Sequence, residues 1–350
     1  MKNLLFTILF AIIFSSHAIS QKTNPGHMLI TGFKGTSPSD AKIVKLKQLI
    51  DRQEIGGIIV FKRNIENKKQ LKTLLSYLTK DRDIFVAIDH EGGVVNRLTH
   101  PSFQLKTPSP ELFCKLSKEK QEIYANQISK TLKEIGINVN LGGVVDIAPL
   151  IYKSSICKYK RCFADSQELI SSCTSVLFNS HKSDELFFAL KHFPGHGSTP
   201  VDSHYNLPDI TQSHSQYDFM PYFKVIDPKT KYNMVMVGHL MNKQVDENYP
   251  ASLSKKHIKT LTHELNYKGL IITDDLNMGA LYNVSRNKAK IATIAAKAGN
   301  HLLLFEYLTF DEIKQISARL KREAKEDNVL NQHIELSNKL IFDSLSLNDQ

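Results

Sequence analysis

Short apolar runs alternate with amphipathic segments along most of the chain. Eight runs have the length and apolar character of buried strands, at residues 27–31, 57–61, 84–89, 137–146, 187–192, 233–239, 269–274 and 301–305. The clearest helical segments between them repeat apolar positions every three or four residues, at 41–53, 68–78, 118–135, 167–180, 255–265, 288–298 and 311–324. In the second of these segments, four leucines would line one helix face: Leu71, Leu74, Leu75 and Leu78.

This alternation of strands and helices predicts an α/β fold, a (β/α)8 TIM-type barrel. Several predicted helices also follow a residue that commonly caps a helix: Asp40, Ser117, Ser166 and Ser254. The alternative, an open doubly wound sheet, would need a glycine-rich nucleotide turn after an early strand, and there is no convincing G-x-G-x-x-G. No linker or internal repeat divides the chain, so we expect residues 21–350 to form a single barrel domain.

The first twenty residues have a different pattern. A lysine at position 2 precedes an apolar run from Leu4 to Phe14, and small residues lie just before Gln21. This pattern is typical of a secretory signal peptide, so we expect residues 1–20 to be cleaved and the protein to be secreted or periplasmic. An uncleaved membrane anchor is the alternative, and no later stretch is apolar enough to span a bilayer.

Export also changes the interpretation of the four cysteines, because disulfides persist outside the cytoplasm. Cys157 and Cys162 are close enough in sequence for a short loop bridge, whereas Cys114 and Cys173 are far from both. Sequence spacing alone does not decide the connectivity, and free buried thiols are the alternative.

The net charge of +10 is compatible with affinity for anionic surfaces such as cell-wall polymers. We favour the simpler interpretation, a lysine-covered surface without a specific partner. The lysines are scattered and not interleaved with aromatic residues, so the pattern argues against a nucleic-acid-binding protein. We expect a monomer.

The densest group of titratable residues is the sequence KHFPGHG at residues 191–197, followed by Asp202-Ser203-His204. Glycine and proline make a helix through it unlikely, so it is predicted to be a loop after a strand, where catalytic groups are often found. Two other interpretations are a zinc site and a solvated loop. His192 and His196 have the spacing of zinc ligands, but that spacing brings two ligands together only on a helix. In the second interpretation, the segment is a solvated loop and its histidines have no function.

Acidic residues end two other apolar runs. Asp274 and Asp275 follow residues 269–273, and Asp89 follows residues 85–88, with paired glycines and Arg97 shortly after. An aspartate after a strand often caps the next helix, which suits Asp275 better than Asp274. In a parallel barrel, the polar residues at strand ends would all lie at one end, the reactive face of this fold: Asp89, Asp146, Lys191, His192, His239 and Asp274.

Together these motifs resemble glycoside hydrolase family 3, in its β-N-acetylhexosaminidase branch. The similarity runs from about residue 28 to residue 305, and the histidine-bearing loop is its most diagnostic part. The other matching segments are residues 56–65, 89–93, 140–146, 161–163 and 272–278.

The resemblance implies a role for individual residues. Asp274 matches the family nucleophile, and His204 matches the acid/base, with Asp202 completing a dyad. Five residues match those that hold the terminal N-acetylglucosamine: Asp89, Arg97, Arg161, Lys191 and His192. The implied activity is removal of terminal β-N-acetylglucosamine from peptidoglycan fragments or chitin-type oligosaccharides, through a covalent glycosyl-enzyme. No cofactor or metal is implied.

The chain departs from the family pattern at a few positions. Val94 replaces a common arginine, Gly143 replaces a proline, and Asn300-His301 replaces an acidic pattern at the last strand. Three alternatives stay open: a β-glycoside phosphorylase or a β-glucosidase on the same scaffold, and a secreted carbohydrate-binding pseudoenzyme. Against the last, both the matched nucleophile and the dyad are present.

Overall fold

The computed structural model describes residues 23–147 and 154–346. Eight parallel strands form one sheet in the order β7-β6-β5-β4-β3-β2-β1-β8. Their bounds are β1 (Leu29–Gly32), β2 (Gly57–Val60), β3 (Phe85–Ile88), β4 (Val139–Val144), β5 (Phe187–Phe193), β6 (Asn233–Val237), β7 (Leu270–Thr273) and β8 (Leu303–Phe305). A parallel bridge between Ile272 and Leu302 brings β7 beside β8, and Thr273 N donates to Leu302 O at 3.0 Å. The sheet therefore closes on itself, and the predicted TIM-type barrel is confirmed.

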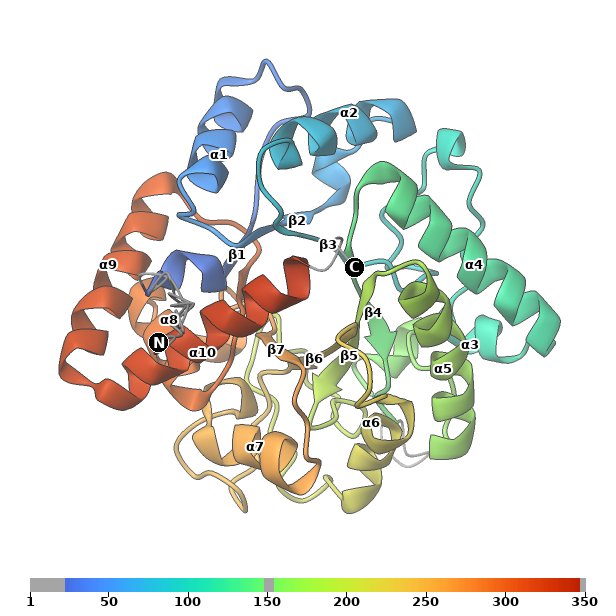
Figure 1. Ribbon diagram of the computed structural model, residues 1–350. Helices are drawn as coiled ribbons and strands as arrows, with labels where there is room; N and C mark the ends of the chain where they lie inside the picture. The colour runs from blue at the N-terminus through green and yellow to red at the C-terminus, as the bar shows by residue number, and fades with distance from the viewer. Residues whose placement is uncertain (1–22, 148–153, 347–350) are drawn as a thin grey trace, which may run out of the picture.

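Helices surround the strands in a ring (Figure 1). Those with predicted counterparts are α1 (Ala41–Asp51), α2 (Lys68–Thr79), α4 (Lys118–Ile135), α5 (Gln167–Ser183), α7 (Lys255–Lys259), α8 (Lys288–Ala298) and α9 (Phe310–Glu326). The segment predicted after Ser254 is α-helical only in its first half, and a π-helical turn spans Thr260–Glu264. Among the described residues, three α-helices have no predicted counterpart: α3 (Pro110–Cys114), α6 (Met220–Val225) and α10 (Asn328–Leu345). The first two are very short, and the buried face of α10 is interrupted by Ser337 and Asn338.

Side-chain caps begin most of the predicted helices. The serine hydroxyls at Ser117, Ser166 and Ser254 each accept a backbone N–H from the first turn of the following helix. Asp40 is different, because its carboxylate accepts from the backbone N–H groups of Thr36 and Ser37, at 2.9 and 3.2 Å. Asp40 therefore stabilises the turn before α1 and does not cap the helix with its side chain.

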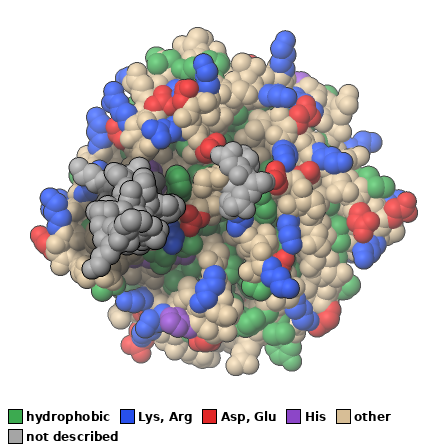
Figure 2. Space-filling view, viewed as in Figure 1, with side chains coloured by type: hydrophobic (Ala, Val, Ile, Leu, Met, Phe, Trp, Pro, Cys, Tyr) green, Lys and Arg blue, Asp and Glu red, His purple; other side chains and the backbone are tan. Residues whose placement is uncertain are grey.

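The helix α10 lies across the end of the barrel at which the strands begin (Figure 1). Asn24 N, just before β1, donates to Asn338 Oδ1 at 2.9 Å, and Lys231 Nζ, just before β6, donates to Ser344 O at 3.1 Å. On this face, lysine and arginine side chains are spread out and interspersed with acidic ones (Figure 2). The positive charge visible here is thus not gathered into one patch.

Two disulfides join the cysteines. Cys114–Cys173 ties α3 to α5, and Cys157–Cys162 closes the short loop considered in the sequence. The disulfide interpretation is therefore confirmed over free thiols. Among the described residues, no helix combines the length and apolar character needed to cross a bilayer. The expected signal peptide, residues 1–20, lies outside the described residues.

The leucine stripe of α2 supplies a test of the core. All four leucines have no exposed surface, as the periodicity predicted. We expect Leu74→Ala to lower the free energy of unfolding by ~2–5 kcal/mol, because it removes buried methyl groups and leaves a cavity. Ile123→Ala on α4 is the control, since this side chain is 49% exposed. Urea unfolding followed by circular dichroism measures both, and an equal loss in the two variants would contradict the packing described here.

Candidate active site

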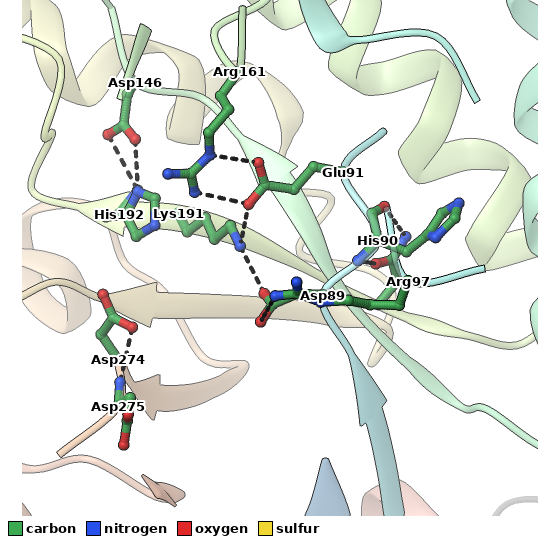
Figure 3. A network of polar contacts seen from close by, with 11 residues as sticks. Asp89, His90, Glu91, Arg97, Asp146, Arg161, Lys191, His192, Asp274 and Asp275 are labelled. Atoms are coloured by element: carbon green, nitrogen blue, oxygen red, sulfur yellow. Dashed lines mark hydrogen bonds and ion pairs between the residues drawn. The ribbon is translucent and has the colours of Figure 1, made fainter. Parts of the chain in front are cut away.

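Polar side chains gather at the carboxyl ends of four strands. Asp89 directly follows β3, and Asp146 lies just beyond β4. Lys191 and His192 are near the carboxyl end of β5, and Asp274 directly follows β7. Because all strands run in the same direction, these residues meet at one end of the barrel (Figure 3). The gathering of strand-end residues expected from the sequence is therefore present in the structure.

Two of these residues, Asp89 and Lys191, form ion pairs with three residues from nearby loops. The five together are named the cation cluster: Asp89, Glu91, Arg97, Arg161 and Lys191. Lys191 Nζ lies 2.9 Å from Asp89 Oδ1 and 2.7 Å from Glu91 Oε1. Arg161 makes two parallel contacts of 2.8 Å with Glu91, through Nε and Nη2. Arg97 Nη2 lies more loosely, 3.8 Å from Asp89 Oδ2.

The charges of this cluster stabilise one another. Burial by itself would raise the pKa of Glu91, but Lys191 and Arg161 outweigh it and lower that pKa to about 2. Burial likewise opposes the charge on Lys191, and Asp89 and Glu91 outweigh it, so the pKa of Lys191 is raised. Glu91 and Lys191 are therefore both ionised at neutral pH, and Glu91 has no proton to give to a substrate.

His192 is held by a buried carboxylate from β4. Its Nδ1 lies 2.7 Å from Asp146 Oδ2, and Asp146 Oδ1 accepts the backbone N–H groups of His192 and His196. Burial opposes ionisation of Asp146, but His192 outweighs it and lowers the pKa of this carboxyl. An ionised carboxylate only accepts, so Nδ1 of His192 carries a proton and Nε2 is left for other partners.

Asp274 lies beside two histidines and is partly exposed. Its Oδ1 accepts from the backbone N–H of Asp275 at 2.8 Å. Burial would raise the pKa of Asp274, but His192, His239, the Asp275 N–H and Lys191 together lower it to about 2. His239 is fixed by Ser252 Oγ at 2.7 Å and by the carbonyl of Asp275 at 2.8 Å. The carboxylate is therefore charged and held by its surroundings.

Asp275, the second carboxylate of the pair, has a structural role. Its Oδ1 accepts the backbone N–H groups of Asn277, at 3.0 Å, and of Glu306, at 2.8 Å. It thus ties the loop after β7 to the residues after β8. The next helical turn begins only at Gly279, so Asp275 is not the helix cap considered in the sequence.

Asp202 and His204 form the pair expected from their spacing. His204 Nδ1 lies 2.7 Å from Asp202 Oδ1, and the same oxygen accepts the His204 backbone N–H at 3.0 Å. The loop that carries them is docked on the loop after β7, because Gly279 N donates to His204 O and Ala280 N donates to Ser203 O, at 3.0 and 3.2 Å. The His204 side chain is 65% exposed. Burial lowers the pKa of His239. Asp274 acts to raise that pKa and His204 acts to lower it, so both side chains lie near His239. The dyad therefore lies on the same side of the barrel as Asp274.

The fold is shared with proteins of known type. Residues 31–339 match the family model described as Glycosyl hydrolase family 3 N terminal domain. The chain belongs to glycosyl hydrolase family 3.

Several similar proteins are named for the same activity. A Beta-hexosaminidase of Neisseria meningitidis serogroup C is 31% identical, covering 74% of this chain and 73% of its own. Beta-hexosaminidase A of Pseudoalteromonas piscicida is 28% identical over 82% of this chain. A solved family 3 β-N-acetylglucosaminidase from Paenibacillus sp. is 26% identical, covers 93% of this chain and superposes with a TM-score of 0.80. The chain spans 52% of the Pseudoalteromonas relative and 62% of the Paenibacillus chain.

The structure places the expected site residues of this family 3 chain in three groups. Four of the expected sugar-binding residues lie in the cation cluster: Asp89, Arg97, Arg161 and Lys191. His192 is held by Asp146 and acts on the pKa of Asp274. The pair Asp202–His204 lies on a loop that is hydrogen-bonded to the loop after β7. The zinc alternative loses support, because His192 is held by Asp146 whereas His196 Nε2 contacts Ser203 Oγ at 3.2 Å.

Sequence reasoning did not assign three buried residues that hold the site together. They are Glu91 behind Arg161 and Lys191, Asp146 behind His192, and His239 beside Asp274. Asp146 and His239 did have a signal, their places at strand ends. Glu91 lay within a matching motif, but no sequence pattern links it to Arg161, which is 70 residues away.

A large cavity of 1290 Å³ lies elsewhere in this family 3 barrel. Its lining comes from residues that precede β1, β2 and β3 and from α9 and α10, so it opens at the opposite end from the cation cluster. None of the expected catalytic or sugar-binding residues lines it. Because the chemistry-bearing residues are at the other end, we do not place the active site there.

The lowered pKa of Asp274 predicts a pH dependence of stability. A carboxyl whose pKa is lowered on folding stabilises the protein fully at pH values above its ordinary pKa of 3.8. This stabilisation is lost as the pH falls through that value towards the folded-state pKa of about 2. We therefore expect the stability of the wild type relative to Asp274→Asn to decline by up to ~2 kcal/mol between about pH 5 and pH 2. Urea titrations at several pH values measure this difference. A difference that stays constant with pH would contradict the lowered pKa.

Proposed function

We propose that this family 3 protein is a retaining β-N-acetylhexosaminidase that removes terminal β-N-acetylglucosamine from the non-reducing end of glycans. The observation that carries the proposal is the placement of ionised Asp274 beside a loop that presents an Asp202–His204 pair. A carboxylate nucleophile and a proton donor are the two groups that retaining hydrolysis needs. The printed names of the bacterial relatives and of the Paenibacillus structure support the choice of sugar.

In the first step of the proposed reaction, an oxygen of Asp274 attacks the anomeric carbon of the sugar. The bond from that carbon to the leaving oxygen breaks, and its electron pair goes to the oxygen. Nε2–H of His204 protonates this oxygen, so the leaving sugar departs as an alcohol. The products are a glycosyl-enzyme on Asp274 and a neutral imidazole at His204.

In the second step, neutral His204 takes a proton from water, and the water oxygen attacks the anomeric carbon. The bond to Asp274 breaks, and its electron pair restores the carboxylate. His204 keeps the proton that it took from water and is thereby returned to its charged form. Asp202 orients the imidazole through Nδ1 and stabilises its charged form, as a carboxylate does in a Ser-His-Asp triad. Neither a metal ion nor a cofactor is needed for these steps.

The cation cluster and His192 would hold the terminal sugar. Lys191, Arg97 and Arg161 supply N–H donors for sugar hydroxyl and carbonyl oxygens, and Asp89 can accept from a hydroxyl. Because Asp89 is 20% exposed and Arg97 is 27% exposed, these side chains are open to a ligand while anchored in the protein. The proposed substrates are peptidoglycan fragments or chitin-type oligosaccharides.

We further propose that residues 21–350 form one barrel domain that acts as a monomer after export and removal of residues 1–20. A relative named as a secreted glycosyl hydrolase of Arthroderma benhamiae, 28% identical over 87% of this chain, supports the export. The proposed location is secreted or periplasmic.

The alternatives make distinguishable predictions. A phosphorylase would release N-acetylglucosamine 1-phosphate when phosphate is present, whereas a hydrolase releases the free sugar with or without phosphate. A β-glucosidase would prefer a chromogenic β-glucoside to the matching N-acetyl-β-glucosaminide. A carbohydrate-binding pseudoenzyme would bind the sugar and turn over neither substrate.

The central test is the loss of Asp274. We expect the wild type to hydrolyse a chromogenic N-acetyl-β-glucosaminide, and Asp274→Ala to lose activity by several powers of ten, because no other group can form the covalent intermediate. Circular dichroism should be unchanged. Residual activity above about one per cent of wild type would exclude Asp274 as the nucleophile.

The dyad is tested by the dependence on the leaving group. An activated phenolate leaves with little protonation, so His204→Ala should slow cleavage of a natural disaccharide far more than glycosylation by an activated aryl glycoside. With the aryl glycoside, the glycosyl-enzyme should accumulate because water lacks its base, and intact-protein mass spectrometry would detect it. Asp202→Asn should give a milder form of both effects. Equal losses on the two substrates would assign the acid/base to another group.

A further inference from the structure

Glu91 is a buried carboxylate directly behind the proposed sugar-binding residues (Figure 3). Its side chain has no exposed surface, whereas Arg161 is 14% exposed and Lys191 is 3% exposed. A sugar bound at the strand ends therefore cannot contact Glu91 in this arrangement. We propose that Glu91 is a positioning residue, which orients Arg161 and Lys191 so that their remaining N–H donors face the terminal sugar. The inference rests on the proposed function and assigns a residue that supports it.

Both oxygens of Glu91 are used by these two cations. Oε2 accepts from Arg161 Nε at 2.8 Å, and Oε1 accepts from Arg161 Nη2 at 2.8 Å and from Lys191 Nζ at 2.7 Å. A two-point contact of this kind fixes the plane of the guanidinium and leaves its third nitrogen, Nη1, for another partner. Lys191 carries three N–H donors and directs two of them to Asp89 and Glu91, so one is left for a ligand.

The same carboxylate overcomes the repulsion between the two cations. The positive charge of Arg161 acts against the protonated form of Lys191, and both are mostly buried. Without a negative charge between them, at least one would move towards solvent. Asp89 can compensate Lys191, but among the described residues it has no ion pair with Arg161. Glu91 is therefore the residue that couples the two donors in one geometry.

The backbone around Glu91 is fixed by a tight turn. Glu91 N and Gly92 N both donate to Val95 O, at 3.0 and 3.2 Å. Gly92 has a φ of 97°, and a Cβ there would lie 2.1 Å from Pro108 O. Only glycine fits this position without a shift of the chain. This turn, which needs glycine at position 92, thus fixes the backbone from which the Glu91 carboxylate extends.

The sharpest variant is Glu91→Gln, because it keeps the shape and removes the charge. An amide presents one oxygen and one NH2 group, whereas Arg161 and Lys191 direct donors at both positions. In either orientation of the amide, a donor would face a donor, so Arg161 or Lys191 must move. We expect the inhibition constant of free N-acetylglucosamine to rise by about 10- to 100-fold, and kcat/KM to fall at least as much, the range expected for lost hydrogen bonds to charged groups.

The matched control is Glu134→Gln. Glu134 also pairs with a lysine, Lys68, at 2.7 Å, but its side chain is 50% exposed. This variant should stay within about twofold of wild type in both constants, because exposed ion pairs contribute little. Thermal unfolding is recorded for each protein, and Glu91→Asp, which keeps the charge, serves as a second variant. It should bind N-acetylglucosamine better than Glu91→Gln if the charge orients the cations.

A double-mutant cycle separates positioning from a general structural role. If Glu91 acts through Arg161, Glu91→Gln should cost much less in the Arg161→Gln background than in the wild type. Fully multiplicative losses, or a Glu91→Gln variant that binds N-acetylglucosamine like wild type, would overturn the inference. If the wild type prefers another glycoside, the same comparison is made with that sugar. A wild type that turns over no glycoside would instead contradict the proposed function and this inference with it.

Discussion

The active end of this barrel depends on keeping a buried lysine charged. The Lys191 side chain is 3% exposed, and an isolated ammonium in such a place would lose its proton or draw water into the core. Asp89 and Glu91 prevent this by lying within 3 Å of its nitrogen. Glu91 in turn is buried, so it needs Arg161 as a second cation. One buried charge therefore requires partners from three separate segments, and these partners shape the surface that we propose binds a sugar.

The barrel makes such a chain possible because its strands end together. Asp89 and Glu91 follow β3, Lys191 and His192 are near the end of β5, and Asp274 follows β7. All of them therefore lie at the same end of the barrel. The loops beyond the strands are then free to add groups, as the loop with Asp202 and His204 does. That loop is held by two backbone hydrogen bonds to the loop after β7 and not by burial of its histidine. The structure thus combines a buried, ion-paired group that we propose binds the sugar with a more exposed pair that we propose is the acid/base.

The fold was predictable from sequence because local patterns carry it. Strands and amphipathic helices can be predicted from the spacing of apolar residues that are close in sequence. All eight strands lie where the apolar runs predicted them. The helix α10 was missed because Ser337 and Asn338 interrupt its buried face. The expected site residues came from motif resemblance and strand-end position. What neither could supply was the pairing of Glu91 with Arg161 and of Asp146 with His192, because those contacts join segments 70 and 46 residues apart.

The pairing of carboxylates also explains why Asp274, among several acidic residues at this end, suits the role of nucleophile. Five carboxylates here are committed to other partners: Asp89 and Glu91 to Lys191, Asp146 to His192, Asp202 to His204, and Asp275 to two backbone N–H groups. Asp274 receives one hydrogen bond, from the neighbouring N–H to Oδ1, and Oδ2 accepts none from the residues the structure describes. Its charge is nevertheless stabilised by nearby histidines and Lys191, which lower its pKa without binding its oxygens. An ionised carboxylate with an uncommitted oxygen is what nucleophilic attack requires. Asp202 and Asp275 also have an Oδ2 without a partner among the described residues, but their Oδ1 atoms hold His204 and two backbone N–H groups. Asp274 holds no other segment, since its one hydrogen bond comes from the adjacent residue.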